Sequence, residues 1–188
     1  MDYIREQAKP VDKLSHQERL YALTKHVGIG QVYDDDVVFA AAWLHDLGVF
    51  IGHRPEDLAA LANWDMIGYA ANTVPSLLKQ FGFPEEKISP VVDIIREHQP
   101  AGNPGQIEGV IIRDADILEQ LGAAGVLRTV CKIGRDTRFK TFPDALRVLQ
   151  KNADTLFDQL CLPASRELAK PRLQLLKAFL QAANAEGC

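Results

Sequence analysis

The apolar positions of this chain recur with the spacing of an α-helix over most of its length. The clearest stretch ends in the sequence Ala-Ala-Ala-Trp-Leu, followed directly by His45, Asp46, Leu47 and Gly48. Positions i, i+3, i+4 and i+7 lie on one helical face, and here they are Val38, Ala41, Ala42 and His45. The imidazole of His45 is therefore expected to point into the protein. Burying the charged carboxylate of the neighbouring Asp46 costs free energy unless a positive group, such as a metal ion, compensates the charge. The alternative is that the carboxylate is solvated at the end of a surface helix.

Other segments show the same helical period, and the sequence contains no long alternating strand pattern. The predicted helices, with approximate ends, cover residues 12–27, 34–45, 55–62, 65–81, 84–98, 107–121, 143–160 and 165–183. The acidic run 34–36 is interpreted as a helix start rather than a metal cluster, because carboxylates there complement exposed amide groups. We expect an all-α, single-domain helical bundle over residues 1–188, with a core at about 12–130 and C-terminal helices at about 143–185 packing on it.

Composition limits the classes of protein to consider. The chain has 188 residues, of which 47% are hydrophobic and 24% charged, as is ordinary for a soluble globular protein. A formal net charge of −4 argues against broad electrostatic binding to duplex nucleic acid. No apolar run is long enough to span a membrane, and residues 1–5 lack the apolar core of a signal peptide. We therefore expect a cytoplasmic protein with no membrane partner.

Further polar positions lie on inward faces of the predicted helices. His16 extends the apolar stripe of residues 20, 23 and 27 backwards, and His98 lies three residues after a buried stripe. Asp114 and Asp116 lie in a helix that is apolar on nearly every side, but residues two apart point about 200° apart around a helix. Periodicity alone slightly favours Asp114 as inward. Imidazoles and carboxylates suit a divalent ion such as Mn, Fe, Ni, Zn or Mg, although a core histidine without a metal is the alternative for His16.

Three short sequences, taken in order, resemble the H…HD…D signature of the HD-domain metal-dependent phosphohydrolases. They are His16 in His-x-x-Arg, the pair His45-Asp46, and Asp116 in Ala-Asp-Ile-Leu. The likeness covers most of the chain, and the sequences at 82–84, 95–98 and 121–128 resemble an uncharacterised hydrolase branch of that family. The resemblance implies that the metal ligands are His16, His45, Asp46 and Asp116, against the weak preference for Asp114. Asp114 would then orient an imidazole or a water.

The same resemblance implies hydrolysis of a small phosphorylated substrate, a nucleotide or a related phosphate ester or anhydride, by a metal-activated water. Asp46 would also help to deprotonate that water, and His98 would contact phosphate or donate a proton. Arg19 would bind phosphate, with a surface salt bridge as the alternative. One divalent ion is expected. A second ion near His98 and His53 is left open, and a homodimer is compatible with the sequence.

The chain also departs from the family pattern. Residues 63–68 lack the histidine that completes a two-metal site in many members, and Gly48, Val49 and Phe50 stand where some nucleotidases carry a catalytic acid. A non-catalytic nucleotide-binding or sensor module with the same fold is therefore the alternative function, and a metal-dependent lyase or hydratase is a third. The basic run from Arg128 to Lys140 is interpreted as a solvated connector, with an anion site as its alternative.

Overall fold

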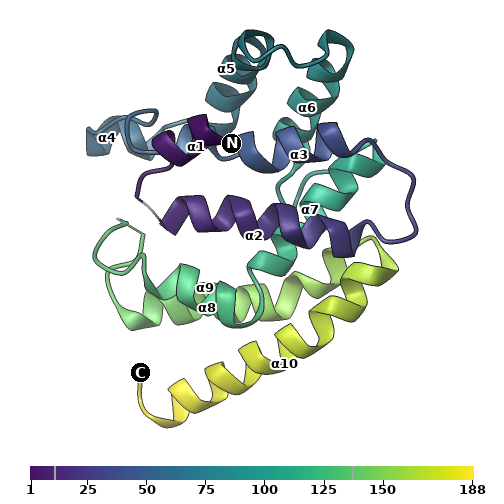
Figure 1. Cartoon of the computed structure of the whole chain (residues 1–188). Coiled ribbons are helices and arrows are strands. Elements are labelled where there is room, and N and C mark those ends of the chain that lie inside the picture. Colours follow the sequence, from purple (N-terminus) through teal and green to yellow (C-terminus); the bar gives the residue numbers. More distant parts are fainter. Residues whose placement is uncertain (11, 137) are drawn as a thin grey trace. The chain divides into compact units, whose positions relative to one another are not determined.

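The structure, a computed structural model, describes residues 1–10, 12–136 and 138–188, and they form an all-α protein (Figure 1). These described residues contain no β-strand; an isolated bridge between Ile51 and Arg54 is the one extended pairing among them. The predicted fold class is thereby confirmed. Among the same residues, no helix combines the length and the apolar character needed to cross a membrane.

The chain divides into two compact units, Met1–Arg113 and Asp114–Cys188. The helices of the first unit are α1 (Asp2–Gln7), α2 (Asp12–Val27), α3 (Asp35–Leu44), the short 3-10 helix η1 (Leu47–Val49), α4 (Leu58–Ala62), α5 (Met66–Gln80) and α6 (Glu85–Glu97). Helix α7 (Ile107–Glu119) begins in the first unit and ends in the second. The expectation of a single domain over residues 1–188 stays a prediction.

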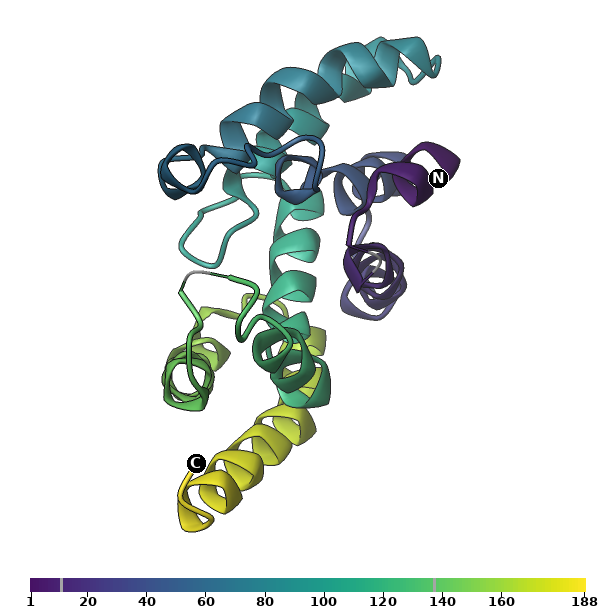
Figure 2. The ribbon, with the colours of Figure 1, turned by 90° about the vertical axis from the view of Figure 1, so that its left-hand side faces the viewer.

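Helix α3 lies at the centre of the first unit. It packs against both α2 and α6, and α5 packs against α6 (Figure 2). From Val37 to Leu44 every residue of α3 except Phe39 is buried, as its apolar sequence requires. His45 and Asp46 directly follow the last residue of this buried helix. Both residues therefore lie within the first unit.

The acidic run before α3 has the structural role expected from the sequence. The side chain of Asp34 accepts hydrogen bonds from the backbone N–H groups of Asp36, at 3.0 Å, and Val37, at 3.4 Å. The ammonium of Lys87 on α6 pairs with Asp34 at 2.8 Å and with Asp36 at 2.6 Å. The run therefore caps α3 and ties it to α6.

The second unit contains the end of α7 together with α8 (Gly122–Val130), α9 (Phe142–Thr155), the 3-10 helix η2 (Phe157–Gln159) and α10 (Pro163–Ala185). Helices α8, α9 and α10 pack against one another. Their buried faces carry the predicted apolar stripes, including Leu149, Leu156 and Leu176.

Two helices differ from the predictions. Helices α1 and α8 are not among the helices predicted from the sequence. Gly122 has a φ of +67°, a left-handed conformation that suits glycine, and α8 starts there. Helix α5 continues through Pro75 without interruption.

Candidate metal centre

Three potential metal ligands come together in the first unit: His16 from α2, and His45 and Asp46 from the end of α3. One ligand atom from each lies within 4.8 Å of the others. The packing of α2 against α3 brings them together, because His16 lies on the buried face of α2. Three of the four ligands predicted from the sequence thus form one group.

Asp46 presents one carboxylate oxygen to each imidazole. Its Oδ2 is 3.9 Å from Nε2 of His16, and its Oδ1 is 3.8 Å from Nε2 of His45. The two imidazole rings meet edge to face, with centroids 5.4 Å apart. The side chains of His16 and His45 are 3% and 1% exposed, and that of Asp46 is 17% exposed, so solvent reaches the group through the aspartate.

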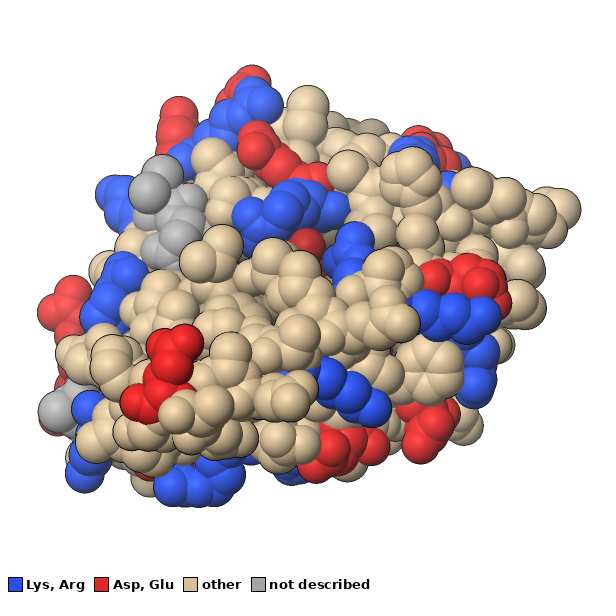
Figure 3. Space-filling model, turned by 90° about the horizontal axis from the view of Figure 1, so that it is seen from below, with Lys and Arg blue, Asp and Glu red and all other residues tan. Residues whose placement is uncertain are grey.

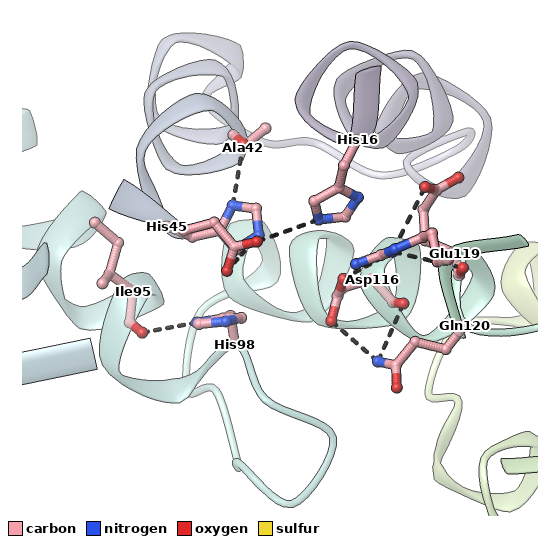
Figure 4. A network of polar contacts seen from close by, with 10 residues as sticks. His16, Ala42, His45, Ile95, His98, Asp116, Glu119 and Gln120 are labelled. Carbon is pink, nitrogen blue, oxygen red and sulfur yellow. Dashed lines mark hydrogen bonds and ion pairs between the residues drawn. The ribbon is translucent and has the colours of Figure 1, made fainter. Parts of the chain in front are cut away.

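The backbone fixes the orientation of His45. Its Nδ1 is 3.0 Å from the carbonyl oxygen of Ala42, which can only accept, so Nδ1 carries the hydrogen (Figure 4). Nε2 then bears a lone pair, and this is the nitrogen that faces Asp46. Metal-binding histidines commonly use such a bond from the second ring nitrogen to hold the tautomer and the ring direction. The donor set and its orientation therefore fit a divalent metal ion.

His98 extends the group of imidazoles. It follows α6 directly, is 6% exposed, and donates from Nδ1 to the carbonyl oxygen of Ile95 at 2.7 Å. Its ring centroid lies 4.9 Å from that of His45 (Figure 4). The structure thus brings His98, predicted to contact phosphate or move a proton, beside the candidate ligands, with its Nε2 held as the acceptor nitrogen.

The electrostatic environment favours an ionised Asp46. Burial alone would raise the pKa of its carboxyl group, but the electrostatic effect of His45, Lys13, His16 and His98 outweighs burial and holds the pKa below its usual range. Lys13, which lies three residues before His16, also belongs to this environment, and no sequence motif includes it. A carboxylate held ionised among imidazoles is the form that binds a cation.

Arg19 also lies on α2, three residues after His16, and its side chain is exposed. It therefore occupies the same side of the helix as His16 at a more open position. The proposed contact of Arg19 with phosphate stays a prediction.

Asp116 lies in the second unit, on the last turns of α7. Its Oδ2 accepts a hydrogen bond from Nε2 of Gln120 at 3.1 Å, and its Oδ1 is 3.9 Å from the guanidinium of Arg128 (Figure 4). Its side chain is 13% exposed, so the carboxylate is largely buried but not enclosed. The role of Asp116 as a fourth ligand stays a prediction from the sequence.

Asp114 has a structural role in the second unit. It is completely buried, as periodicity indicated, but its oxygens accept from the backbone N–H groups of Cys161, at 3.1 Å, and Leu162, at 2.8 Å, and from the hydroxyl of Ser165 at 2.7 Å. These donors belong to the segment that starts α10. The carboxylate of Asp114 therefore anchors the start of α10. The expectation that it also orients an imidazole or a water stays a prediction.

The segment after Asp46 is held by structural contacts. The indole N–H of Trp64 donates to the carbonyl oxygen of Gly48 at 2.7 Å. His53 lies between the hydroxyl of Tyr69, 2.9 Å from its Nδ1, and the amide oxygen of Gln7, 3.0 Å from its Nε2. Burial lowers the pKa of His53, which favours its neutral form. His53 thus connects α1 to α5, and a second metal near it stays a prediction.

The basic run from Arg128 to Lys140 includes cations that are paired with acids of the same unit. Arg128 is 3.6 Å from the carboxylate of Glu119, and Arg138 is 2.7 Å from that of Asp136. On the face shown in Figure 3, basic and acidic side chains are interspersed in small groups. The two ion pairs favour the interpretation of this run as a connector.

Comparison with known proteins places the site in a family. The sequence model of the HD domain matches residues 14–121, which include all four predicted ligands. YpgQ from Bacillus subtilis is 24% identical with a TM-score of 0.75, and the match covers 99% of this chain and 94% of that one. YpgQ has also been solved in complex with ADP, a structure that is 23% identical to this chain with a TM-score of 0.74, covering 99% of this chain and 94% of that one.

An HD-superfamily hydrolase from Bacillus thuringiensis is 20% identical with a TM-score of 0.68, over 100% of this chain and 93% of that one. No curated protein matches the chain. The solved structures share its fold, and the family model covers more than half of its length. The chain belongs to the HD domain family.

Proposed function

We propose that this protein is a metal-dependent phosphohydrolase that acts on a small phosphorylated molecule, a nucleotide or a related phosphate ester or anhydride. The observation that carries the proposal is the group of His16, His45 and Asp46, in which two buried imidazoles face one carboxylate that is partly exposed. The orientation of His45 through the carbonyl of Ala42 supports it further, because this bond directs the acceptor nitrogen at the carboxylate.

The proposed metal ligands are His16, His45, Asp46 and Asp116. The first three are supported by geometry and the fourth by the order of the sequence motifs. A divalent ion in this site supplies a water of lowered pKa and polarises a phosphoryl oxygen. These ligand types accept Mn, Fe, Ni, Zn or Mg, so the proposal is one divalent ion per chain without commitment to its identity.

The other residues would act on the substrate and its protons. Asp46 has its carboxylate at the exposed edge of the group and is proposed to accept a proton there in addition to binding metal. His98, with Nδ1 fixed by Ile95, is proposed to donate a proton or to contact phosphate through Nε2. Arg19 is proposed to bind substrate phosphate. The ADP complex of YpgQ supports a phosphorylated small molecule as the substrate class.

The test uses wild-type protein and the variants His45→Ala and Asp46→Ala. Metal content is measured by mass spectrometry, and release of phosphate and pyrophosphate is measured for nucleoside diphosphates, nucleoside triphosphates and phosphate monoesters. His26→Ala on α2 and Asp154→Ala on α9 serve as matched controls, because both residues are exposed and outside the site. The proposal requires that the wild type and controls hydrolyse a member of the panel and that both site variants lose metal and activity. Full activity in either site variant contradicts it.

The alternative function, a nucleotide-binding or sensor module, is favoured by two observations: residues 63–68 contain no histidine, and no acid stands at Gly48, Val49 or Phe50. It predicts that wild-type protein binds metal and ADP but releases no phosphate from any member of the panel. Metal binding without either nucleotide binding or turnover would instead favour a lyase or hydratase.

A further inference from the structure

The turn that follows α3 begins at the backbone of Asp46 itself. Asp46 has a φ of −93° and a ψ of +13°, the bridge conformation, with which the chain leaves α3 and enters η1. Its carbonyl oxygen accepts from the N–H of Val49 at 2.9 Å, and the carbonyl oxygen of Leu47 accepts from the N–H of Phe50 at 3.4 Å. The direction of the Asp46 side chain therefore depends on the shape of this turn.

The carbonyl oxygen of Gly48 is bound from outside the turn. Continuation of the 3-10 pattern would give it the N–H of Ile51, three residues on, but that group donates to the carbonyl oxygen of Lys9 at 3.0 Å. The oxygen accepts instead from the indole N–H of Trp64 at 2.7 Å. Gly48 is buried, where an unpaired backbone carbonyl costs about as much as a lost hydrogen bond. Trp64 thus completes the hydrogen bonds of the turn.

The segment that carries Trp64 also contacts Gly48 through its backbone. A Cβ on Gly48 would lie 2.3 Å from the carbonyl oxygen of Met66, so the two backbones are in direct contact. The N–H of Met66 donates to the carbonyl oxygen of Trp64 at 3.2 Å, and the indole packs on the ring of Tyr69 with centroids 5.1 Å apart. Because Met66 and Tyr69 belong to α5, that helix fixes the position of Trp64 beside the turn.

The carboxylate of Asp46 is sensitive to movement of this turn. In aspartate a single carbon separates the backbone from the carboxyl group, so a shift of the backbone moves the oxygens by a similar distance. These oxygens lie 3.8 Å from Nε2 of His45 and 3.9 Å from Nε2 of His16. Ligand distances in a metal site have to be met to within about 0.2 Å. A small displacement of the turn would therefore weaken the binding of an ion.

We propose that Trp64 is a positioning residue for Asp46. Its indole N–H holds the carbonyl of Gly48, this bond fixes the turn after α3, and the turn places the carboxylate that binds the metal ion. The proposal rests on the proposed function, because it takes Asp46 as a metal ligand. It also gives residues 63–68, which contain no histidine, a part in the metal centre through a hydrogen bond.

The simpler interpretation is that Trp64 stabilises the fold and does not affect the metal centre. Its loss would then lower the free energy of unfolding without changing metal binding. A positioning residue has a further, reciprocal property. If the indole hydrogen bond favours the arrangement that binds the ion, the bound ion has to favour the indole hydrogen bond by the same factor.

The first measurement is the Mn²⁺ affinity of wild type, Trp64→Phe and Tyr21→Phe by electron paramagnetic resonance titration. Trp64→Phe removes the N–H and keeps an aromatic ring beside Tyr69. Tyr21→Phe is the matched control, because it also removes one donor from a half-buried side chain of the first unit, a hydroxyl that donates to Asp35 at 2.9 Å. Asp35 lies at the end of α3 opposite to His45. Thermal unfolding gives the stability of each protein.

Trp64→Phe is expected to bind Mn²⁺ about 10-fold to 100-fold more weakly than wild type, the usual effect of losing an outer-shell partner in a metal site. At saturating Mn²⁺ its spectrum should also differ from that of wild type, because the spectrum of the bound ion reports the geometry of the ligands. Tyr21→Phe should match wild type in affinity and in spectrum, even where it loses stability.

The second measurement uses wild-type protein. Exchange of the indole hydrogen of Trp64 with deuterium is followed by nuclear magnetic resonance, with and without a saturating diamagnetic ion, Zn²⁺ or Mg²⁺. The chain has two tryptophans, so the spectrum contains one other indole signal, that of Trp43. The ion should slow the exchange at Trp64 about 10-fold or more, because the hydrogen bond has to open before the hydrogen exchanges. This measurement decides the proposal if thermal unfolding shows that Trp64→Phe is not folded.

Two results overturn the inference and leave the proposed function intact. They are an Mn²⁺ affinity of folded Trp64→Phe within about twofold of wild type, and an exchange rate at Trp64 that the bound ion does not slow. An equal loss of affinity in Tyr21→Phe would also overturn it, because the loss would then follow stability and not the position of Asp46. A wild-type protein that binds no divalent ion overturns the proposed function itself, and the inference with it.

Discussion

Each unit contains an aspartate that is largely or fully withdrawn from solvent, Asp46 in the first and Asp114 in the second, and the two carboxylates have different surroundings. In the second unit, Asp114 accepts from two backbone N–H groups and one hydroxyl, all of which belong to the start of α10. In the first unit, Asp46 faces Nε2 of His45 at 3.8 Å and Nε2 of His16 at 3.9 Å, distances that are too long for direct hydrogen bonds. One carboxylate is satisfied by the fold, and the other is surrounded by groups that bind a cation.

This difference shows how a carboxylate of a binding site can be distinguished from one with a structural role when both are withdrawn from solvent. Two donors to Asp114 are backbone N–H groups directly before α10, and the third is the hydroxyl of Ser165 in the first turn of α10, so all three are tied to the start of that helix. The groups around Asp46 are side chains fixed from behind, as His45 is by Ala42 and His98 is by Ile95. The hydrogen bonds from Nδ1 hold the rings of His45 and His98 in place, and the Nε2 atoms of both rings are directed at one region.

The largest expected effect on stability comes from Asp114→Ala. The substitution leaves buried N–H groups of Cys161 and Leu162 and the hydroxyl of Ser165 without their acceptor, so the free energy of unfolding should fall by about 3 to 5 kcal/mol. Urea unfolding measures it. Ser165→Ala, which removes one donor only, should cost about 1 kcal/mol. If Asp114→Ala lowers the free energy of unfolding by less than about 1 kcal/mol, the proposed difference between the two aspartates is wrong.

Asp46→Asn tests the other half of the comparison. It keeps the size of the side chain but removes the charge that attracts the ion, so Mn²⁺ affinity should fall about 100-fold or more, beyond the range for loss of an outer-shell partner. The variant should remain folded, as checked by circular dichroism. If its loss of stability exceeds that of Asp114→Ala while metal affinity is kept, the roles of the two residues are reversed.

A smaller effect is expected just after Asp46, where the first unit has structural contacts of its own. A Cβ at Gly48 would clash with the backbone carbonyl of Met66, which belongs to α5, so Gly48→Ala should destabilise the protein by about 2 kcal/mol. Gly105→Ala is the control, because nothing lies within 4 Å of the added Cβ there. Equal stabilities of the two variants would show that this segment is not closely packed.

The smallest effect concerns His53. Because its pKa is lowered in the folded protein, the unfolded chain binds a proton more readily. Stability should therefore be constant well above pH 6.5 and should fall as pH decreases through about 6.5 towards the lower folded pKa. Urea unfolding at several pH values, compared with His53→Gln, isolates this contribution; exposed His26→Gln is the control. The comparison fails if wild type and His53→Gln share one pH profile.

The sequence predicted the all-α class and most helices because their apolar stripes run over three or more turns. It missed α1, whose six residues are too few for a periodic pattern to be read. It undervalued α8, since Gly122 and Gly125 are poor helix formers and the packing of α9 and α10 outweighs that local cost.

Motif order predicted His16, His45 and Asp46 as one group, and the structure brings them together. The role of Asp114 could not be predicted, because its partners lie 47 to 51 residues away and two of them are backbone groups without a sequence signature. Lys13 was missed for a similar reason. Its relation to Asp46 depends on the packing of α2 against α3, and nothing in the local sequence distinguishes it from a surface lysine.

The central claim is that the group of His16, His45 and Asp46 binds a divalent metal ion. Titration of purified, chelator-treated protein with Mn²⁺, followed by electron paramagnetic resonance, tests it directly. The account predicts a saturable site in wild type and in His26→Ala, and its loss in His45→Ala and Asp46→Ala. A wild-type protein that binds no Mn²⁺, or site variants that bind it as wild type does, would contradict the account.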